Sequence, residues 1–208
     1  MLYLVKTPGW INKVFRQRIW KIETQEREIF FTFDDGPHPD HTPYVLDILK
    51  ERNAKATFFC VGKNVKAFPG IYQRILDEGH AVGNHTHDHL NGSKTADALY
   101  LANVKAAQQY IDSKLFRPPF GKISSFIVEQ LLSPAYGLST VMWTVLSGDF
   151  DPKMSKEQCL KNVILNAGQG SIVVFHDSEK ANERMRYALP AALSYFENKG
   201  FTFKKLQT

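Results

Sequence analysis

The feature that most constrains the fold is a regular alternation of short apolar runs with longer helical patterns. Seven runs rich in β-branched and aromatic residues predict strands at 28–33, 56–61, 80–83, 115–116, 140–144, 171–175 and 201–203. Helical spacing between them predicts helices at 42–52, 69–79, 95–114, 124–132, 155–167 and 187–199. Strands that alternate with helices form βαβ units and hence a parallel sheet. The alternation alone does not decide whether the sheet stays open or closes into a barrel.

Ionisable residues follow five of the predicted strands, and their positions favour the barrel. They are Asp34 and Asp35 after the first strand, residues 85–89 after the third, Arg117 after the fourth, Asp149 after the fifth and His176 at the end of the sixth. In a (β/α) barrel these loops emerge at one rim, where active sites are built. We therefore predict an α/β fold, a parallel barrel of seven or eight strands with these side chains gathered on one rim.

The chain length and composition predict one domain over residues 1–208, with its core at 28–208. A single core grows efficiently up to roughly 250 residues, and no repeat or linker-like stretch interrupts the sequence. Cys60 and Cys159 are too few for a disulfide framework, and Cys60 lies in an apolar run. The net charge of +5 is mild, and no basic and aromatic motif typical of nucleic-acid binding occurs, so we predict no nucleic-acid partner.

The N-terminal part predicts a helical extension at 10–22. Residues 1–5 are apolar but too few for a secretory signal, and no run is long enough to span a membrane, so we expect a cytoplasmic or peripheral membrane location. Residues 10–22 place apolar side chains at helical spacing with basic residues between them. Such a helix can make a weak contact with an anionic membrane surface. We predict instead that its apolar face packs on the core.

The sharpest local motif is the stretch at 84–89, which contains three histidines. On a helical turn, side chains four residues apart share a face, so His85 and His89 can hold one metal ion while His87 points away. Neutral imidazoles suit zinc and similar divalent metals. The plainer alternative is a polar surface loop with incidental histidines. His38 and His41 are also near, but we expect both to lie in a solvent-facing loop.

The adjacent carboxylates Asp34 and Asp35 can form a simple turn with Gly36, or they can divide catalytic work. Successive side chains leaving a strand diverge, so one can bind a metal while the other acts as a base. Asp35 with His85 and His89 would give three protein ligands and leave a position for water or substrate. Non-haem iron oxygenases use a similar ligand set. A hydrolase, unlike an oxygenase, also needs the second carboxylate and the separate imidazole on this rim.

Four motifs resemble, in order and spacing, those of the polysaccharide deacetylases, carbohydrate esterase family 4 with the NodB homology domain. They are Thr32-Phe33-Asp34-Asp35-Gly36, His85-Thr86-x-x-His89, Arg117-Pro118-Pro119-Phe120-Gly121 and Ile172-Val173-Val174-Phe175-His176-Asp177. The resemblance covers the chain from about Glu28 to its C-terminus. It implies a distorted (β/α) barrel and one divalent metal ion, usually zinc, that polarises an N-acetyl carbonyl.

The resemblance also implies individual roles. Asp34 would be the base that activates water, and Asp35, His85 and His89 would be the metal ligands. Arg117 would orient Asp34 and hold down its pKa.

On the leaving-group side, His176 would protonate the departing amine and Asp149 would orient His176 and keep it protonated. The backbone N–H near Phe120 would donate to the oxyanion. Val174, where the family often has Leu, would line the pocket for the acetyl methyl group.

The sequence departs from the family after the strand that carries Trp143. An Asp-x-x-Asp-Trp arrangement is common there, but Leu146 replaces the first Asp and Phe150 replaces the Trp. Asp149 keeps the second carboxylate. These changes affect substrate recognition more than the chemistry.

The leading hypothesis is a metal-dependent hydrolase that removes N-acetyl groups from an amino sugar in a polysaccharide, oligosaccharide or glycan precursor, by cleaving a linear amide C–N bond. The substrate partner would be an N-acetylated carbohydrate, and no stable protein partner is implied. One alternative is hydrolysis of a non-sugar amide or a cyclic imide. Another is a catalytically silent carbohydrate-binding module, which the loss of a ligand or base would mark. No such loss is seen in the sequence.

Overall fold

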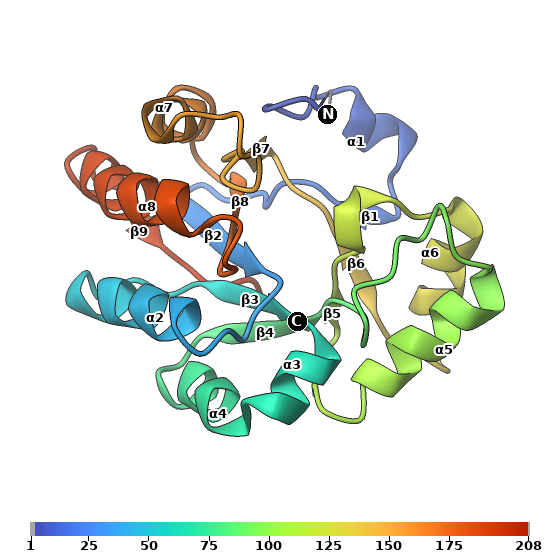
Figure 1. Cartoon of the computed structure of the whole chain (residues 1–208). Coiled ribbons are helices and arrows are strands. Elements are labelled where there is room, and N and C mark those ends of the chain that lie inside the picture. The colour runs from blue at the N-terminus through green and yellow to red at the C-terminus, as the bar shows by residue number, and fades with distance from the viewer. Residues whose placement is uncertain (1–2, 208) are drawn as a thin grey trace.

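The structure, a computed structural model that describes residues 3–207, is a distorted (β/α) barrel (Figure 1). Its strands are β1 (Arg18–Ile19), β2 (Glu28–Asp34), β3 (Thr57–Cys60), β4 (Ala81–Asn84), β5 (Leu115–Phe116), β6 (Ser139–Val141), β7 (Val145–Leu146), β8 (Ile172–His176) and β9 (Thr202–Phe203). Its helices are α1 (Ile11–Val14), α2 (His41–Glu51), α3 (Gly62–Ala67), α4 (Pro69–Asp77), α5 (Asp97–Ala107), α6 (Ser125–Leu132), α7 (Lys156–Asn166) and α8 (Asn182–Glu197), with a short 3-10 turn at Pro119–Gly121.

All strand pairs in the sheet are parallel, as the alternating pattern predicts. Eight strands follow one another in the order β1-β6-β5-β4-β3-β2-β8-β7, and β9 pairs with the beginning of β2. The prediction of a barrel with seven or eight parallel strands is therefore confirmed. Parallel pairing places the carboxyl ends of the strands on one rim of the barrel.

The N-terminal segment runs alongside β6 and β7, the strands nearest the open side of the sheet. The Leu146 N–H donates to the Val5 carbonyl at 2.8 Å, and the Thr7 N–H donates to the Thr144 carbonyl at 2.8 Å. Further along, the Met142 N–H donates to the Ile19 carbonyl at 2.7 Å. The segment thus supplies backbone partners to strands that would otherwise present free edges.

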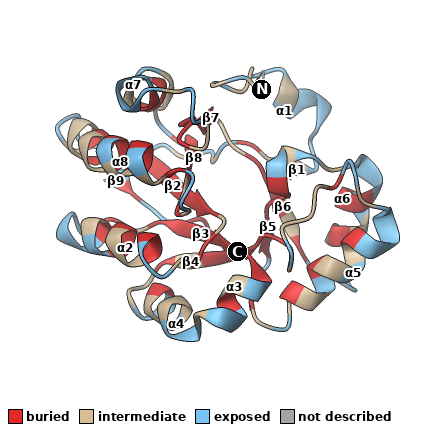
Figure 2. Cartoon of the chain, in the orientation of Figure 1, coloured by how far each residue is buried: buried red, intermediate tan, exposed pale blue. Residues whose placement is uncertain are grey.

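The strand side chains alternate between two apolar layers. On β2, Ile29, Phe31 and Phe33 pack into the large core that also contains side chains of the outer helices. Phe30 belongs to a second cluster, with side chains of β3, β6 and β8. Alternate residues of a strand share a face, so Asp34 lies on the Phe30 face, which points into the barrel. Figure 2 shows the strands buried and the outer faces of the helices exposed.

The predicted helix at 10–22 is wrong. Its helical part, α1, covers four residues and has no buried residue. Arg18 and Ile19 instead form β1, which pairs with β6, and the Ile22 N–H donates to the Gly170 carbonyl at 2.9 Å. These backbone pairings require an extended chain, so they override the helical spacing of the apolar side chains. The predicted packing of a helical apolar face on the core therefore fails as well.

Smaller differences concern short elements. β1, β7 and α3 have no counterpart among the elements predicted from the sequence, and the predicted helix at 95–114 is too long because α5 ends at Ala107. Both cysteines are buried and free, as expected. Among residues 3–207, no helix is both long and apolar enough to cross a lipid bilayer.

Candidate active site

A buried ion pair lies inside the barrel at the end of β2. Arg117, which follows β5, is fully buried. One of its terminal nitrogens donates to Asp34 Oδ1 at 2.6 Å and to Thr32 Oγ1 at 2.7 Å. The remaining guanidinium N–H groups donate to the carbonyl oxygens of Val141 and Met142. The guanidinium is thereby fixed in orientation and holds one oxygen of the Asp34 carboxylate.

Asp35, His85 and His89 form a cluster next to this ion pair. Oδ1 of Asp35 lies 3.0 Å from Nε2 of His89 and 3.6 Å from Nε2 of His85. One ligand atom from each residue falls within 4.8 Å of the other two. His87 lies outside the cluster, and its ring stacks on that of Tyr110. The structure therefore brings together the three residues that the sequence analysis assigns to a metal.

The two histidines converge through an irregular loop, so the expected helical turn at 85–89 is wrong. Thr86 and His89 have φ values of 63° and 58°, and Asp35 has a φ of 82°. Left-handed backbone is costly for such residues and is concentrated at functional sites. The Thr86 N–H donates to the Asn84 side chain at 2.8 Å, which helps to hold the loop in this shape.

The hydrogen bonding of His85 suits a metal ligand. Its Nδ1 lies 2.8 Å from the carbonyl oxygen of Arg117. Because a carbonyl oxygen only accepts, Nδ1 carries a proton, which leaves Nε2, turned toward Asp35, as the atom that can bind a metal. Zinc ligands at about 2.0–2.1 Å in tetrahedral geometry lie roughly 3.3 Å apart. The separations of 3.0 and 3.6 Å lie on either side of that value, so the three residues fit zinc or a similar divalent ion.

The Asp35 carboxylate is held in its charged form. Desolvation by itself would raise its pKa, but hydrogen bonds from His85 and His89 and the nearby His176 outweigh that effect. The pKa of Asp35 therefore lies well below its ordinary range. A charged carboxylate beside two imidazoles is the state that a divalent cation requires.

His176 and Asp149 form a second histidine–carboxylate pair on the rim. Nδ1 of His176 lies 2.8 Å from Asp149 Oδ1, and the backbone N–H of His176 donates to Asp149 Oδ2 at 2.7 Å. Burial by itself would lower the pKa of His176. The negative charge and hydrogen bond of fully buried Asp149, followed by the charges of Asp35 and Asp34, raise it to about 10.

A contact that the sequence analysis did not identify supports this pair. Arg184 of α8 donates to the Asp149 backbone carbonyl at 2.6 Å and holds the loop that carries Asp149.

Phe150, which replaces the Trp common in the family, packs edge-on against the His176 ring, with ring centroids 5.2 Å apart. Leu146 is buried in β7, where it pairs with Val174 of β8.

The remaining predicted substrate residues lie near the Asp35, His85 and His89 cluster or inside the barrel. Phe120 is 55% exposed and has a φ of 60°, and its ring contacts that of His89 with centroids 4.8 Å apart. A Cβ on Gly121 would lie 2.4 Å from the Trp143 ring, so only glycine allows this turn to pack on Trp143. Val174 is buried two residues before His176 and so shares its face of β8.

A third buried carboxylate, Asp177, holds the turn that follows Asp35. It accepts a hydrogen bond from the Gly36 N–H at 3.1 Å and another from the Thr42 hydroxyl. Burial and the charges of Asp35 and Asp34 raise the pKa of Asp177 to about 8. A Cβ on Gly36 would lie only 2.1 Å from the Asp177 carboxylate, so this packing requires glycine. The glycine in the Asp-Asp-Gly run was the available sequence signal for this close approach.

The expectation of a solvent-facing loop is wrong for His41. His41 begins α2, is only 3% exposed, and its Nε2 lies 2.8 Å from Glu179 Oε2. Its ring stacks on that of His38, which is half-buried, with centroids 4.1 Å apart. Packing between the loops after β2 and β8 removes His41 from solvent, and sequence spacing does not reveal that packing.

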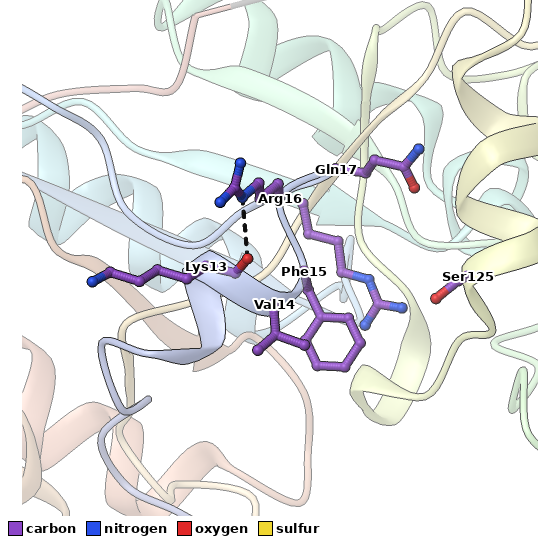
Figure 3. Close-up of a pocket in the computed structure, with 7 residues that line it drawn as sticks. Lys13, Val14, Phe15, Arg16, Gln17 and Ser125 are labelled. Atoms are coloured by element: carbon purple, nitrogen blue, oxygen red, sulfur yellow. Dashed lines mark hydrogen bonds between the residues drawn. The ribbon is translucent and has the colours of Figure 1, made fainter.

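A hollow of about 330 Å³ lies away from this rim, beside α1 (Figure 3). It is lined by Lys13, Val14, Phe15, Arg16, Gln17, Arg18 and Ser125. None of the residues assigned to the hydrolytic chemistry lines it.

Comparison with known proteins agrees with this fold. The chain matches the polysaccharide deacetylase family over residues 21–136, more than half of its length. It is 33% identical over 193 residues to a peptidoglycan-N-acetylglucosamine deacetylase of Bacillus cereus, covering 88% of each chain. It is 32% identical over 209 residues to a chitooligosaccharide deacetylase of Azorhizobium caulinodans, covering 89% of this chain and 96% of the relative.

The solved structure of the Bc1960 peptidoglycan N-acetylglucosamine deacetylase is similar with a TM-score of 0.83 and 30% identity, covering 96% of this chain and 95% of that one. A carbohydrate esterase family 4 pseudoenzyme from Bacillus anthracis shares the fold at 22% identity, with a TM-score of 0.77, over 91% of this chain and 67% of that one. The fold is that of the carbohydrate esterase family 4 barrels. The chain belongs to the polysaccharide deacetylase family.

Proposed function

We propose that the protein is a metal-dependent deacetylase that hydrolyses the N-acetyl amide of an amino sugar in a polysaccharide or oligosaccharide. The observation that carries the proposal is the presence, on one rim, of three groups with different tasks. They are the Asp34–Arg117 pair, the Asp35, His85 and His89 cluster, and the His176–Asp149 pair.

Asp34 is the proposed base. It takes a proton from the attacking water, whose oxygen then bonds to the acetyl carbonyl carbon. Arg117 holds one carboxylate oxygen of Asp34 and leaves the other free for this proton. The full burial of Arg117 among backbone carbonyls keeps the carboxylate in place.

Asp35, His85 and His89 are the proposed ligands of one divalent ion, with zinc as the best match to two imidazoles and a carboxylate. When bound, the ion would polarise the acetyl carbonyl and make the water easier to deprotonate. The Nδ1–H bond of His85 to a backbone carbonyl fixes the ring so that Nε2 points to Asp35.

His176 is the proposed acid. As the C–N bond breaks, it gives its proton to the departing nitrogen, so that acetate and a free amine are the products. Asp149 holds His176 in the protonated form and fixes its orientation through Nδ1. Nε2 of His176 is then the nitrogen that can reach the substrate.

An amino sugar is the proposed substrate class because the relatives named above are peptidoglycan and chitooligosaccharide deacetylases. Phe120, exposed beside His89, and Phe150, beside His176, place one aromatic ring next to each of these two histidines. We propose that these rings and Trp143 contact the sugar, that the backbone N–H near Phe120 donates to the oxyanion, and that Val174 meets the acetyl methyl group.

The test is acetate release from N-acetylglucosamine oligomers of increasing length and from peptidoglycan, with and without a metal chelator. We expect release from at least one of these substrates, its loss with chelator and its recovery with added zinc. Release that chelator does not affect would contradict the metal dependence. Binding of the sugars without acetate release, at any metal loading, would mark a silent binding module. Release only from non-sugar amides would exclude the sugar substrate.

A further inference from the structure

The net positive charge of this protein is concentrated in its N-terminal segment. Residues 1–22 contain five basic residues and no acidic one, namely Lys6, Lys13, Arg16, Arg18 and Lys21. The other 186 residues carry 21 basic and 21 acidic side chains, so the formal charge of +5 belongs to the segment. Neither of the two hollows beside the segment is lined by an acidic residue.

The same segment exposes large apolar side chains. Trp10 and Val14 are each 61% exposed, and the Val14 N–H donates to the Trp10 carbonyl at 3.3 Å. Because residues four apart on a helical turn share a face, these two side chains point the same way. Phe15 is also exposed and lies beside Val14 in Figure 3, and Leu4 is 62% exposed. The ring of Phe15 is partly covered by Arg18 and Trp20, whereas Trp10 and Val14 remain mostly exposed.

Basic side chains lie next to this apolar face. Lys13 and Arg16 extend away from Val14 and Phe15 on the same side in Figure 3, and both are solvent-exposed. Lys6 and Lys21 line the second hollow with Leu165, which is 72% exposed. A tryptophan with neighbouring aliphatic side chains and a surround of Lys and Arg has the composition of a membrane-interface contact.

We propose that the N-terminal segment, residues 4–21, docks the protein on an anionic phospholipid surface. Trp10, Val14 and Phe15 would enter the boundary between headgroups and acyl chains, while the basic residues contact the phosphates. An anionic polymer such as a nucleic acid or an acidic glycan would satisfy the charges but would leave the exposed apolar side chains in water. Exposed apolar area next to the charge therefore favours a lipid surface. The inference does not depend on the proposed hydrolysis.

The test is flotation of the full chain with phosphatidylcholine vesicles that contain or lack phosphatidylglycerol. We expect binding only to the anionic vesicles, and weaker binding at high salt. Each basic residue near an anionic surface contributes roughly fivefold to binding. The double variant Lys13→Glu/Arg16→Glu should therefore bind at least roughly 25-fold more weakly.

The matched control is Lys63→Glu/Lys66→Glu on α3, where two exposed lysines have the same spacing in sequence. It should float like the wild type. Trp10→Ser should weaken flotation, while Leu99→Ser, at a site 60% exposed on α5, should not. Addition of anionic vesicles should also shift the tryptophan emission to the blue in the wild type and not in Trp10→Phe.

Two results would overturn the proposal. One is equal flotation of the Lys13→Glu/Arg16→Glu and Lys63→Glu/Lys66→Glu variants, which would mean that binding does not involve this segment. The other is loss of binding in Lys13→Glu/Arg16→Glu with full binding retained in Trp10→Ser. That result would mean that only charge is recognised, as by an anionic polymer.

Discussion

Two histidine–aspartate sites on the rim are built from the same residue types but differ in the group that the histidine Nδ1 atom faces. In the first, Nδ1 of His85 donates to the Arg117 backbone carbonyl, and Nε2 points at Asp35, whose side chain is 28% exposed. In the second, Nδ1 of His176 faces the carboxylate of fully buried Asp149. A neutral partner on Nδ1 leaves an imidazole with a free lone pair, whereas a charged partner stabilises imidazolium.

This difference in the Nδ1 partner suits one histidine to the proposed metal binding and the other to the proposed proton transfer. Both pairs lie on the same rim, and the charge of Asp35 also contributes to the raised pKa of His176. A cation held by Asp35 would offset part of that contribution. The two sites are therefore linked electrostatically, although their proposed tasks differ.

The largest expected effect is that of removing a ligand from the first site. His85→Ala should weaken metal binding by more than about 100-fold. Loss of a residue that only hydrogen-bonds to a metal ligand already weakens metal binding by roughly 10–100-fold. Acetate release should fall to background together with the metal content, measured by elemental analysis after dialysis. His87→Gln is the matched control, since His87 lies in the same loop but outside the cluster. Equal metal loss in both variants would show that the loop, rather than the ligand, matters.

Substitution of each of the two adjacent carboxylates, Asp34 and Asp35, should have a different effect on metal content and turnover. Asp34→Asn should lower turnover by roughly 10²–10⁴-fold with its metal retained, because the amide keeps the shape of the side chain and removes its basicity. Asp35→Asn should instead lose metal, and added metal should restore part of its activity. Metal content and turnover are measured on the same samples. Loss of metal in Asp34→Asn, with retention in Asp35→Asn, would reverse the proposed roles.

Removal of the imidazole from the second site should affect only the proton transfer. His176→Ala should reduce turnover by roughly 10²–10⁴-fold while the metal stays bound. Substrates with better leaving groups, such as N-acetyl aryl amines, should lose less activity because they need less protonation. An equal loss for good and poor leaving groups would argue against an acid role for His176.

A milder change is expected when only the partner of His176 is altered. Asp149→Asn removes the charge that raises the His176 pKa, so the protonated imidazole is lost at lower pH than in the wild type. The alkaline limb of the profile of kcat/KM against pH should therefore move to lower pH. Turnover near neutral pH should fall by less than the approximately 10²-fold minimum expected for His176→Ala. An alkaline limb that does not move would show that Asp149 does not control the protonation of His176.

Much of the fold can be predicted from the sequence because buried parallel strands have continuous apolar runs. The long strands β2, β3 and β8 fall within two residues of their predicted bounds. Two-residue strands such as β1 and β7 are too short to show a period, and their pairing depends on neighbouring segments. At 10–22, the apolar residues have helical spacing, but backbone hydrogen bonds to β6 decide the conformation.

The candidate site could be predicted in its residues but less well in its geometry. Strand ends identify Asp34, Arg117 and His176, since parallel topology gathers them on one rim. The left-handed backbone at Thr86 and His89, which brings the candidate metal ligands together, occurs at residues that seldom adopt it. No residue-type rule predicts such a loop, and the roles of Arg184 and Asp177 likewise depend on packing between distant loops.

The most direct test of the proposed difference between the two histidine–aspartate sites is the protonation state of His176. It can be observed by nitrogen-15 NMR in the metal-free protein. A suitable condition is about pH 8, between the ordinary histidine pKa of roughly 6.5 and the value of about 10 for His176. Comparison with His176→Gln identifies its signals among the seven histidines. We predict that both ring nitrogens of His176 carry protons under this condition, and that one loses its proton in Asp149→Asn. A wild-type His176 with one bare ring nitrogen at this pH would contradict the account, because the second site would then hold no acid.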